Sequence, residues 1–465
     1  MFSNVNKTTS AEAGKSAFWA MSIFLLLLSI MLLVLGLYYQ IVLHHTPAPL
    51  LLGIAAGFGL GTPLEIWNFS DPDTLMRVMA FQDRFLIVCF GFSIGLGAIL
   101  LYLFAAIPGV SPHYGIKDFF VFGVVVGGLL FGVGVGLAGY FPGTIWIALG
   151  QGRRDAIYAV FGGLLGALTW SLIFGAARGF FWNTFNYGPI TWYSIFGIKS
   201  HLEIFGTSLI FGAILLGMFL FLPRYPKQPV KESCGFHLAG KNNKVLTFDD
   251  MIDDENKKYP DQNQYLIRLT NESSIRNARS IIVLGIAFTV IAVAVILLRQ
   301  IFGESTTYSW IGAQLFYAVN PQYAASNPYW NLFGGMHIVN GKPIDLPFSE
   351  IGWEPFSDLG TFLGGLISSI FISKRFMKFK KRVPLVWEHR FGPSDKKRFV
   401  GSFFGAFLVL FGARMANGCA SGHVLSGNIQ MAISSFVFLM AVLIGSWLTL
   451  YFVMGLKLNS RGYRN

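Results

Sequence analysis

The chain has 465 residues, of which 54% are hydrophobic and only 12% are charged; soluble domains carry about twice that charged fraction. Water is therefore excluded as its main solvent. The formal charge of +12 does not indicate nucleic acid, because the basic residues gather between hydrophobic runs, where the positive-inside rule explains them. We expect an integral membrane protein with no nucleic-acid partner.

Hydrophobic runs recur along the whole chain, and a transmembrane helix needs about 20 mostly apolar residues. The first run, 18–43, is longer than the core of a signal peptide and lacks a small-residue cleavage site, so we expect a retained helix. Further runs lie at 85–106, 119–140, 155–178, 201–222, 280–302, 399–416 and 430–455, with shorter candidates at 50–67 and 357–373. The fold class predicted is all-α, a polytopic membrane protein with about ten crossings.

The loops between the runs predict an orientation. Residues 374–398 carry many Lys and Arg residues and only two acidic ones, Glu388 and Asp395, so this loop is expected in the cytoplasm. Ten crossings then place both termini and the polar stretch 224–279 on the same side. Because that stretch has little apolar surface to bury, we expect a loosely ordered insertion. The expected location is a bacterial inner (cytoplasmic) membrane.

Aromatic stretches occur in the segments predicted on the opposite side. Phe180-Phe181-Trp182, Trp192-Tyr193 and Tyr329-Trp330 are typical of side chains at the headgroup level of a bilayer. We interpret them as bilayer anchors.

A weak internal repeat divides the chain into two halves. At an offset of about 278 residues, Gly127 aligns with Gly405, Gly134 with Gly412, and Phe141 with Cys419. The matched helices run in opposite directions in the predicted topology, which indicates two inverted repeats. The predicted divisions are 1–49 (an extra helix), 50–222 (first repeat), 223–279 (cytoplasmic insertion), 280–456 (second repeat, with an extracytoplasmic insertion at 303–356) and 457–465 (cytoplasmic tail).

Both repeats contain an interruption of a hydrophobic run, at 140–144 and at 417–423. Inverted repeats with broken helices are typical of secondary transporters, in which the breaks meet near the midplane. We therefore expect Arg414, Cys419 and the backbone of Phe141 to converge on one cavity. The alternative for any single glycine is close helix packing alone.

The second break concentrates polar groups inside the membrane domain. Arg414 needs a partner there, which is either an anionic substrate or a structural ion pair or carbonyl clamp. Cys419 offers a weak S–H donor or is a small packing residue. Backbone N–H groups at Ser421, Gly422 and His423 are suited to attract an anion, although His423 is equally suited to an interhelical hydrogen bond. The three cysteines, Cys89, Cys234 and Cys419, are too scattered for a metal site.

The sequence GARMANGCASGHVLSG at 412–427 resembles a signature of the YeeE/YedE family of sulfur-compound transporters. Residues 137–144 with 148–152 resemble the other motif of that family, and Gly57 to Gly61 resemble it more weakly. The resemblance implies inverted halves whose broken helices meet at a constriction, and uptake of thiosulfate or a related sulfur species. Cysteines at the constriction are implied to hand the anion along through S–H contacts, and Cys419 matches one such position.

Two departures separate this chain from the family pattern. Phe141 stands where the first-half motif usually carries cysteine, and the short first helix has Leu64 to Asn68 where another cysteine is expected. A complete cysteine relay is therefore absent, which makes this a divergent member.

The leading hypothesis is a transporter or permease for a small inorganic anion, such as thiosulfate, with no cofactor. The predicted pathway consists of Cys419, Arg414, Asn417, Gly418, Ser421, Gly422, His423, Phe141, Pro142, Gly143 and Thr144. A membrane scaffold or complex subunit with a non-conducting pore is the alternative. An enzyme is disfavoured, because Cys419 and His423 have no third orienting group in the sequence. The predicted partners are the anion, the lipid bilayer and a small cytoplasmic sulfur-carrier protein on the basic loops.

Overall fold

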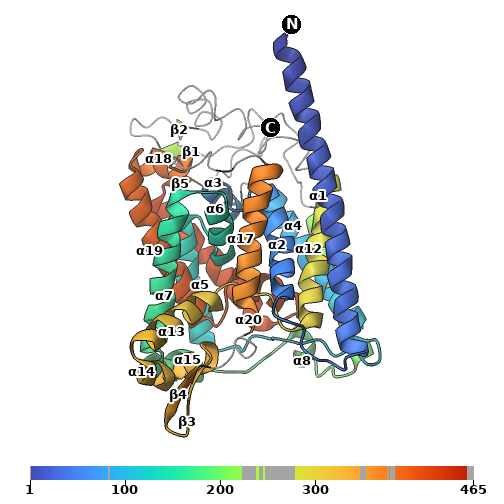
Figure 1. The fold of residues 1–465 in the computed structure, drawn as a ribbon, viewed down its shortest axis with the longest axis vertical. Coiled ribbons are helices and arrows are strands. Elements are labelled where there is room, and N and C mark those ends of the chain that lie inside the picture. Colours follow the sequence, from blue (N-terminus) through green and yellow to red (C-terminus); the bar gives the residue numbers. More distant parts are fainter. Residues whose placement is uncertain are drawn as a thin grey trace.

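The computed structural model describes residues 2–81, 84–221, 237–239, 245–246, 278–345, 352–373, 376 and 383–457. The predictions for the 224–279 insertion, Cys234 and most of the basic 374–382 segment fall largely or wholly outside these residues. The described part is a bundle of roughly parallel and antiparallel helices with a few short strands at its two ends (Figure 1).

The first half of the chain forms one strongly apolar set of helices. Its elements are α1 (Phe2–Ile41), α2 (Leu52–Ile66), α3 (Pro72–Met79), α4 (Arg84–Ala105), α5 (Val121–Ala138), α6 (Pro142–Gly150), α7 (Arg154–Arg178), η1 (Gly179–Asn183), α8 (Trp192–Ile195) and α9 (His201–Phe221). The short strands β1 (His237–Ala239) and β2 (Val245–Leu246) follow.

The second half of the chain is also made mainly of apolar helices, with a polar insertion between them. Its elements are α12 (Ala278–Leu298), α13 (Thr306–Val319), α14 (Pro321–Ser326), α15 (Pro328–Phe333), β3 (Met336–Val339), β4 (Lys342–Asp345), α17 (Glu354–Phe371), α18 (Leu385–Phe391), α19 (Asp395–Met415), η2 (Ala420–Gly427), α20 (Ile433–Leu448), η3 (Thr449–Val453) and β5 (Leu456–Lys457). Strands β3 and β4 form an antiparallel hairpin, and β1 pairs with both β2 and β5.

Eight helical segments within the described residues are long and apolar enough to cross a membrane. They are Trp19–Ile41, Phe85–Ala105, Val121–Gly150, Arg154–Asn183, His201–Phe219, Ile281–Leu298, Asp395–Met415 and Ile433–Val453. Each corresponds to one predicted long run, and the shorter candidates correspond to α2 and α17. The prediction of an all-α polytopic membrane protein is confirmed.

The two halves pack through glycines on α5 and α19. A Cβ added at Gly127 would lie 2.6 Å from the carbonyl oxygen of Gly412, and a Cβ at Gly134 would lie 2.5 Å from that of Gly405. In the proposed repeat Gly127 corresponds to Gly405 and Gly134 to Gly412, so one contact is the symmetry mate of the other. Such close backbone approach is possible only without side chains. The contact pattern is what inverted repeats predict, while the boundaries of the repeats stay predictions.

The ends of the bundle differ in character. The start of α1, α18 and the strand β5 lie at one end, whereas α13, α14, α15 and the β3–β4 hairpin cap the other (Figure 1). We call these the terminal end and the hairpin end. At the hairpin end, Tyr329 and Trp330 are fully buried in a cluster with Trp170 and Phe174. Their interpretation as bilayer anchors is therefore wrong, because α15 folds back and packs them against α7.

Candidate functional site

The first break separates α5 from α6. Gly139 ends α5 in the left-handed conformation (φ 69°), which glycine adopts without a steric penalty. The chain is extended at Phe141, and Pro142 begins α6 at the position where proline is favoured. The hydroxyl of Thr144 accepts from the N–H of Phe141 at 2.8 Å and donates to its carbonyl oxygen at 3.0 Å. These features of the break come from residues that are neighbours in sequence.

The second break separates α19 from η2. The N–H of Gly418 bonds to the carbonyl of Ala413 at 2.8 Å, and Asn417 is left-handed (φ 57°), a conformation that asparagine tolerates better than most residues. Cys419 is extended, and η2, a π-helix, starts at Ala420. Both predicted interruptions are therefore present as helix breaks.

His423 holds the second break together. Its Nε2 lies 2.9 Å from the carbonyl oxygen of Ala416, which can only accept, so Nε2 carries the proton. Nδ1 then accepts from the hydroxyl of Ser435 at 3.2 Å, and the ring stacks on Phe438 at 4.5 Å between centroids. Both nitrogens of this fully buried ring are engaged, which favours the interhelical hydrogen bonder over direct substrate contact.

Arg414 is buried beside the same break and contacts hydroxyl groups and aromatic rings. Its Nε donates to the hydroxyl of Tyr329, and Nη1 donates to Ser305 at 2.9 Å and to Thr306 at 3.2 Å. The guanidinium carbon lies 5.1 Å from the ring centroid of Phe333. Among the described residues Nη2 has no hydrogen-bond partner. The site therefore keeps an unused donor on a permanent cation.

A polar cavity of about 450 Å³ opens beside the second break, close to α13 and α15 of the hairpin end. Its polar lining includes Lys117, Asp118, Thr306, Asn331, Glu354 and Asn417. Lys117 is near enough to the break that a Cβ on Gly418 would lie 3.3 Å from its Cε. It interacts electrostatically with Arg414, Cys419 and Glu354. Lys117 thus brings a basic group close to the buried thiol, in a cavity whose lining also includes two carboxyl groups.

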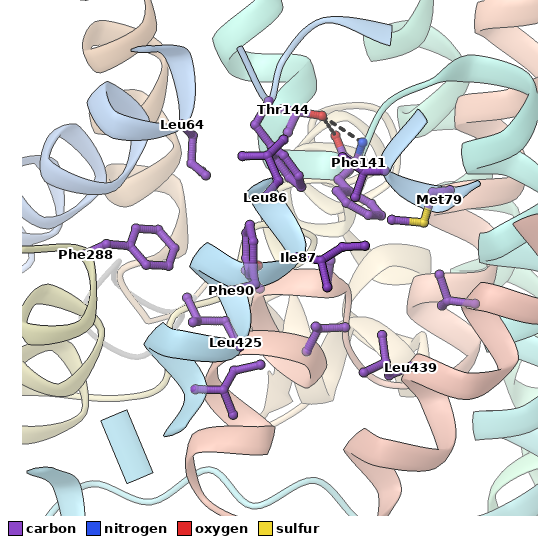
Figure 2. A pocket seen from close by; sticks show the side chains of 18 of the residues that line it. Leu64, Met79, Leu86, Ile87, Phe90, Phe141, Thr144, Phe288, Leu425 and Leu439 are labelled. Atoms are coloured by element: carbon purple, nitrogen blue, oxygen red, sulfur yellow. Dashed lines mark hydrogen bonds between the residues drawn. The ribbon is translucent and has the colours of Figure 1, made fainter. Parts of the chain in front are cut away.

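A second cavity, of about 430 Å³, is lined almost entirely by apolar side chains and is shared by the two breaks. Phe141 and Thr144 reach it from the first break and Leu425 from the second (Figure 2). Ala420 and Ser421 of the second break also line it. Glu304, from the segment between α12 and α13, also lines it. The ring of Phe141 packs against Phe69 and Phe131, with centroids 5.6 and 5.7 Å away. The predicted meeting of the breaks is thus found at this cavity.

Cys419 lies in sequence between Asn417, which lines the polar cavity, and Ser421, which lines the apolar one. Its Sγ is 3.0 Å from the hydroxyl of Ser421. The thiol is 1% exposed. Neither Cys419 nor Arg414 is among the residues that line the two cavities, so the expected convergence of both with Phe141 on one cavity is not found, although residues of both breaks line the apolar cavity.

The remaining residues of the predicted pathway are buried and pack closely against neighbouring segments. Pro142, Gly143, Gly418 and Gly422 are buried, and a methyl group on Gly143 would overlap the carboxylate of Glu304. The hydroxyl of Tyr308 donates to the carbonyl of Pro142 at 3.4 Å. Residues 304–308 therefore contact α6 directly and bridge it to the second break.

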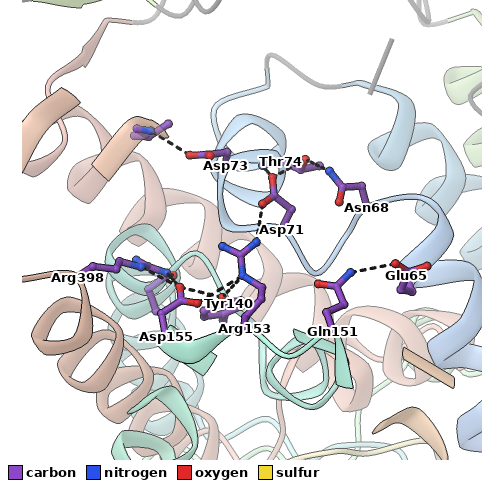
Figure 3. A network of polar contacts seen from close by, with 12 residues as sticks. Glu65, Asn68, Asp71, Asp73, Thr74, Tyr140, Gln151, Arg153, Asp155 and Arg398 are labelled. Carbon is purple, nitrogen blue, oxygen red and sulfur yellow. Dashed lines mark hydrogen bonds and ion pairs between the residues drawn. The ribbon is translucent and has the colours of Figure 1, made fainter. Parts of the chain in front are cut away.

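The terminal end carries a buried ionic network immediately beyond the first break (Figure 3). Arg153 forms ion pairs with Asp71 at 3.0 Å and with Asp155 at 3.4 Å, and Arg398 binds the other oxygen of Asp155 at 2.8 Å. Tyr140, in the break itself, donates to Asp155 at 3.0 Å. Nearby, Gln151 donates to Glu65 at 3.0 Å. The network ties the first break to α7 and α19.

Sequence reasoning missed four charged residues near the two cavities: Lys117, Glu304, Glu354 and Asp358. Lys117 and Glu304 fall in loops, where a charged residue gives no sign that it will be buried at a site. Asp358 had a usable signal, because an acidic residue inside a hydrophobic run such as 357–373 is itself an indication of function.

Two interrupted helices, packed antiparallel and with both breaks lining one cavity, define a polytopic α-helical membrane protein of the transporter class. Comparison with protein families agrees with this class: the family model described as sulphur transport matches residues 68–448. The chain belongs to this family, the YeeE/YedE sulphur transport family. None of the curated proteins compared with the chain matches it.

Proposed function

We propose that the protein takes up a small inorganic sulfur anion, such as thiosulfate, across a bacterial inner membrane. The observation that carries the proposal is the polar cavity beside Cys419, because Lys117 lines it and Arg414 lies next to it with an unused donor. Anions are attracted to these two basic side chains, and the attraction is strong where water is scarce.

The proposed path runs from the polar cavity, past Cys419, to the apolar cavity below Phe141. Asn417 and Lys117 receive the anion, and the thiol of Cys419 with the hydroxyl of Ser421 donates to it at the narrow point. Gly418, Gly422, Pro142 and Gly143 shape the passage, Thr144 holds the first break, and His423 fixes the second. Phe141 replaces a second thiol, so on this side the anion meets aromatic edges and backbone N–H groups instead.

The proposed orientation puts the terminal end in the cytoplasm and the hairpin end outside. It is supported by the basic residues of the terminal end, among them Arg153, Arg154, Arg390 and Lys396, as the positive-inside rule requires. The polar cavity then faces the exterior and collects substrate. A small cytoplasmic sulfur-carrier protein is the proposed acceptor at the other end.

The test is uptake of labelled thiosulfate, sulfite and selenite into proteoliposomes that contain the purified protein. We expect Cys419→Ala to lower thiosulfate uptake about tenfold or more, equivalent to ~1.4 kcal/mol or more of lost stabilisation on the path. Cys89→Ala is the matched control, because Cys89 is a buried thiol that belongs to α4 and to neither break. Equal uptake by both variants and wild type would remove Cys419 from the proposed path.

A scaffold with a closed pore is the second candidate. The cluster of Phe141 with Phe69 and Phe131 favours it, since these rings fill the space where the family usually carries a thiol. Absence of uptake for all three anions by folded wild-type protein would support the scaffold and contradict transport.

A further inference from the structure

Two acidic side chains lie buried next to the narrow point of the proposed path. Glu304 is 7% exposed and Asp358, in α17, is 2% exposed. The hydroxyl of Thr361 donates to Glu304 at 3.4 Å. Neither carboxyl oxygen of Asp358 makes a hydrogen bond of normal geometry within the described part of the chain, although Thr307 lies beside it. Natural proteins rarely leave a buried carboxyl group in this condition without a functional reason.

The two carboxyl groups interact electrostatically with each other and with few cations. The groups facing them are Glu354 of α17, Cys419 and Ser421 of the second break, and Tyr308 of α13. Lys117 interacts electrostatically with Glu354, Arg414 and Cys419. No basic side chain is among the main electrostatic neighbours of Glu304 and Asp358 in the described part of the chain.

Two carboxylates cannot both stay ionised in a buried site that lacks a bound cation. Protons are a neutralising species that the two carboxyl groups bind directly, and a protonated carboxyl group is also a hydrogen-bond donor.

The position of the pair gives such protons a use. Glu304 lines the apolar cavity together with Ser421, whose hydroxyl contacts the thiol of Cys419, and its carboxylate touches Gly143 of the first break. An anion that moves from the polar cavity to the apolar one must pass this group. An ionised Glu304 repels the anion, whereas a protonated Glu304 donates to it.

We propose that Glu304 and Asp358 form a proton-binding pair that couples anion uptake to proton uptake, an inference that rests on the transport function proposed above. Protons enter from the water of the polar cavity, neutralise the pair and admit the anion. The anion and the protons leave towards the terminal end without any change of covalent bonds in the anion. The ionised pair then blocks a further anion until it is protonated again. Two carboxyl groups hold up to two protons, which match the two charges of a dianion.

The experiment uses the full-length protein in proteoliposomes, with labelled thiosulfate outside and a pH-sensitive dye inside, at a clamped membrane potential. For wild type, we expect an inward proton gradient to drive accumulation, about tenfold per coupled proton for each pH unit, together with acidification of the lumen. Glu304→Gln and Asp358→Asn should retain downhill thiosulfate movement and lose the response to the gradient. Glu203→Gln, at an exposed position near the start of α9, is the control and should behave as wild type.

The outcomes separate this inference from the function on which it rests. Thiosulfate uptake by wild type that ignores the proton gradient overturns the coupling and leaves transport intact, as does uptake driven by a sodium gradient instead. No uptake of any anion overturns the transport function itself.

Infrared spectroscopy provides a second readout that needs no transport. Wild type should show the C=O band of a buried protonated carboxyl group, and the band should weaken in Glu304→Gln or Asp358→Asn. Its absence from wild type at neutral pH overturns the proposal even when both variants fail to fold.

Discussion

At Gly143 the backbone of α6 and the carboxylate of Glu304 are in direct contact, with no space for a side chain between them. Glycine is required here by proximity and not by backbone conformation, since residue 143 lies in the first turn of a regular helix. The contact joins the first break to the segment that also reaches the second.

Replacing Gly143 by alanine should therefore displace Glu304. We expect thiosulfate uptake to fall about tenfold or more and stability to fall by about 1–3 kcal/mol, as in other overpacked sites. Uptake in proteoliposomes and thermal unfolding of the purified variant measure the two effects. Gly179→Ala is the control, because a Cβ there meets nothing within 4 Å. Wild-type uptake by Gly143→Ala would mean that Glu304 moves aside without consequence.

At the level of single residues, the sequence predicted the site only where its members are contiguous. Asn417, Cys419, Ser421 and His423 follow one another in one motif, so the sequence alone was enough to propose them together. Glu304 and Lys117 reach the site from distant loops, and only the fold brings them there. Burial of both nitrogens of His423 was equally invisible, because Ala416 is close in sequence but Ser435 belongs to α20.

Among the secondary-structure elements, the two breaks were predictable and their geometries were not. Proline and glycine near residue 142, and glycines around Cys419, indicate interruptions wherever the helix is placed. The π-helical form of η2 depends on tertiary contacts, such as the hydrogen bonds of Ser426 with the backbone of Phe302. Local sequence carries no signal for such contacts.

The ionic network at the terminal end joins several elements through Asp155. Asp155→Asn removes the negative charge between Arg153 and Arg398 and leaves two buried cations short of a partner. We expect a loss of about 3–5 kcal/mol, the range found when one partner of a buried ion pair is removed. Thermal unfolding in lipid nanodiscs measures it.

The control for the network is Asp345→Asn in β4, where an exposed carboxylate accepts from Gln314 at 3.1 Å. Its effect should stay within about 0.5 kcal/mol. If Asp155→Asn is as stable as Asp345→Asn, the network contributes little to holding α7 and α19 together.

For the whole molecule, hydropathy predicted the membrane-crossing helices because each carries its own signal. The neighbours of each helix were not predictable. Helix α2 lies along α17 with backbone contacts at Gly57 to Ser357 and at Gly61 to Thr361, although 300 residues separate each pair. The spacing of glycines indicates that another helix packs closely against this one, but it does not indicate which helix.

The orientation of the whole molecule can be tested with reporters at the end of the chain. With the terminal end in the cytoplasm, a C-terminal green fluorescent protein should fluoresce and a C-terminal alkaline phosphatase should be inactive. Fusions truncated after Lys199, at the hairpin end, should give the reverse pattern. Active phosphatase at the full-length C-terminus would invert the direction of the proposed path.

The glycine contacts between α5 and α19 limit how the protein can move. Gly127 with Gly412 and Gly134 with Gly405 bring backbone against backbone at two levels, so sliding one helix past the other would drive neighbouring side chains into these gaps. A rocking of the two halves about this seam would lose both contacts together. We therefore expect α5 and α19 to keep their relative position throughout a transport cycle. Conformational change should be confined to the few non-helical residues at 139–141 and 416–419.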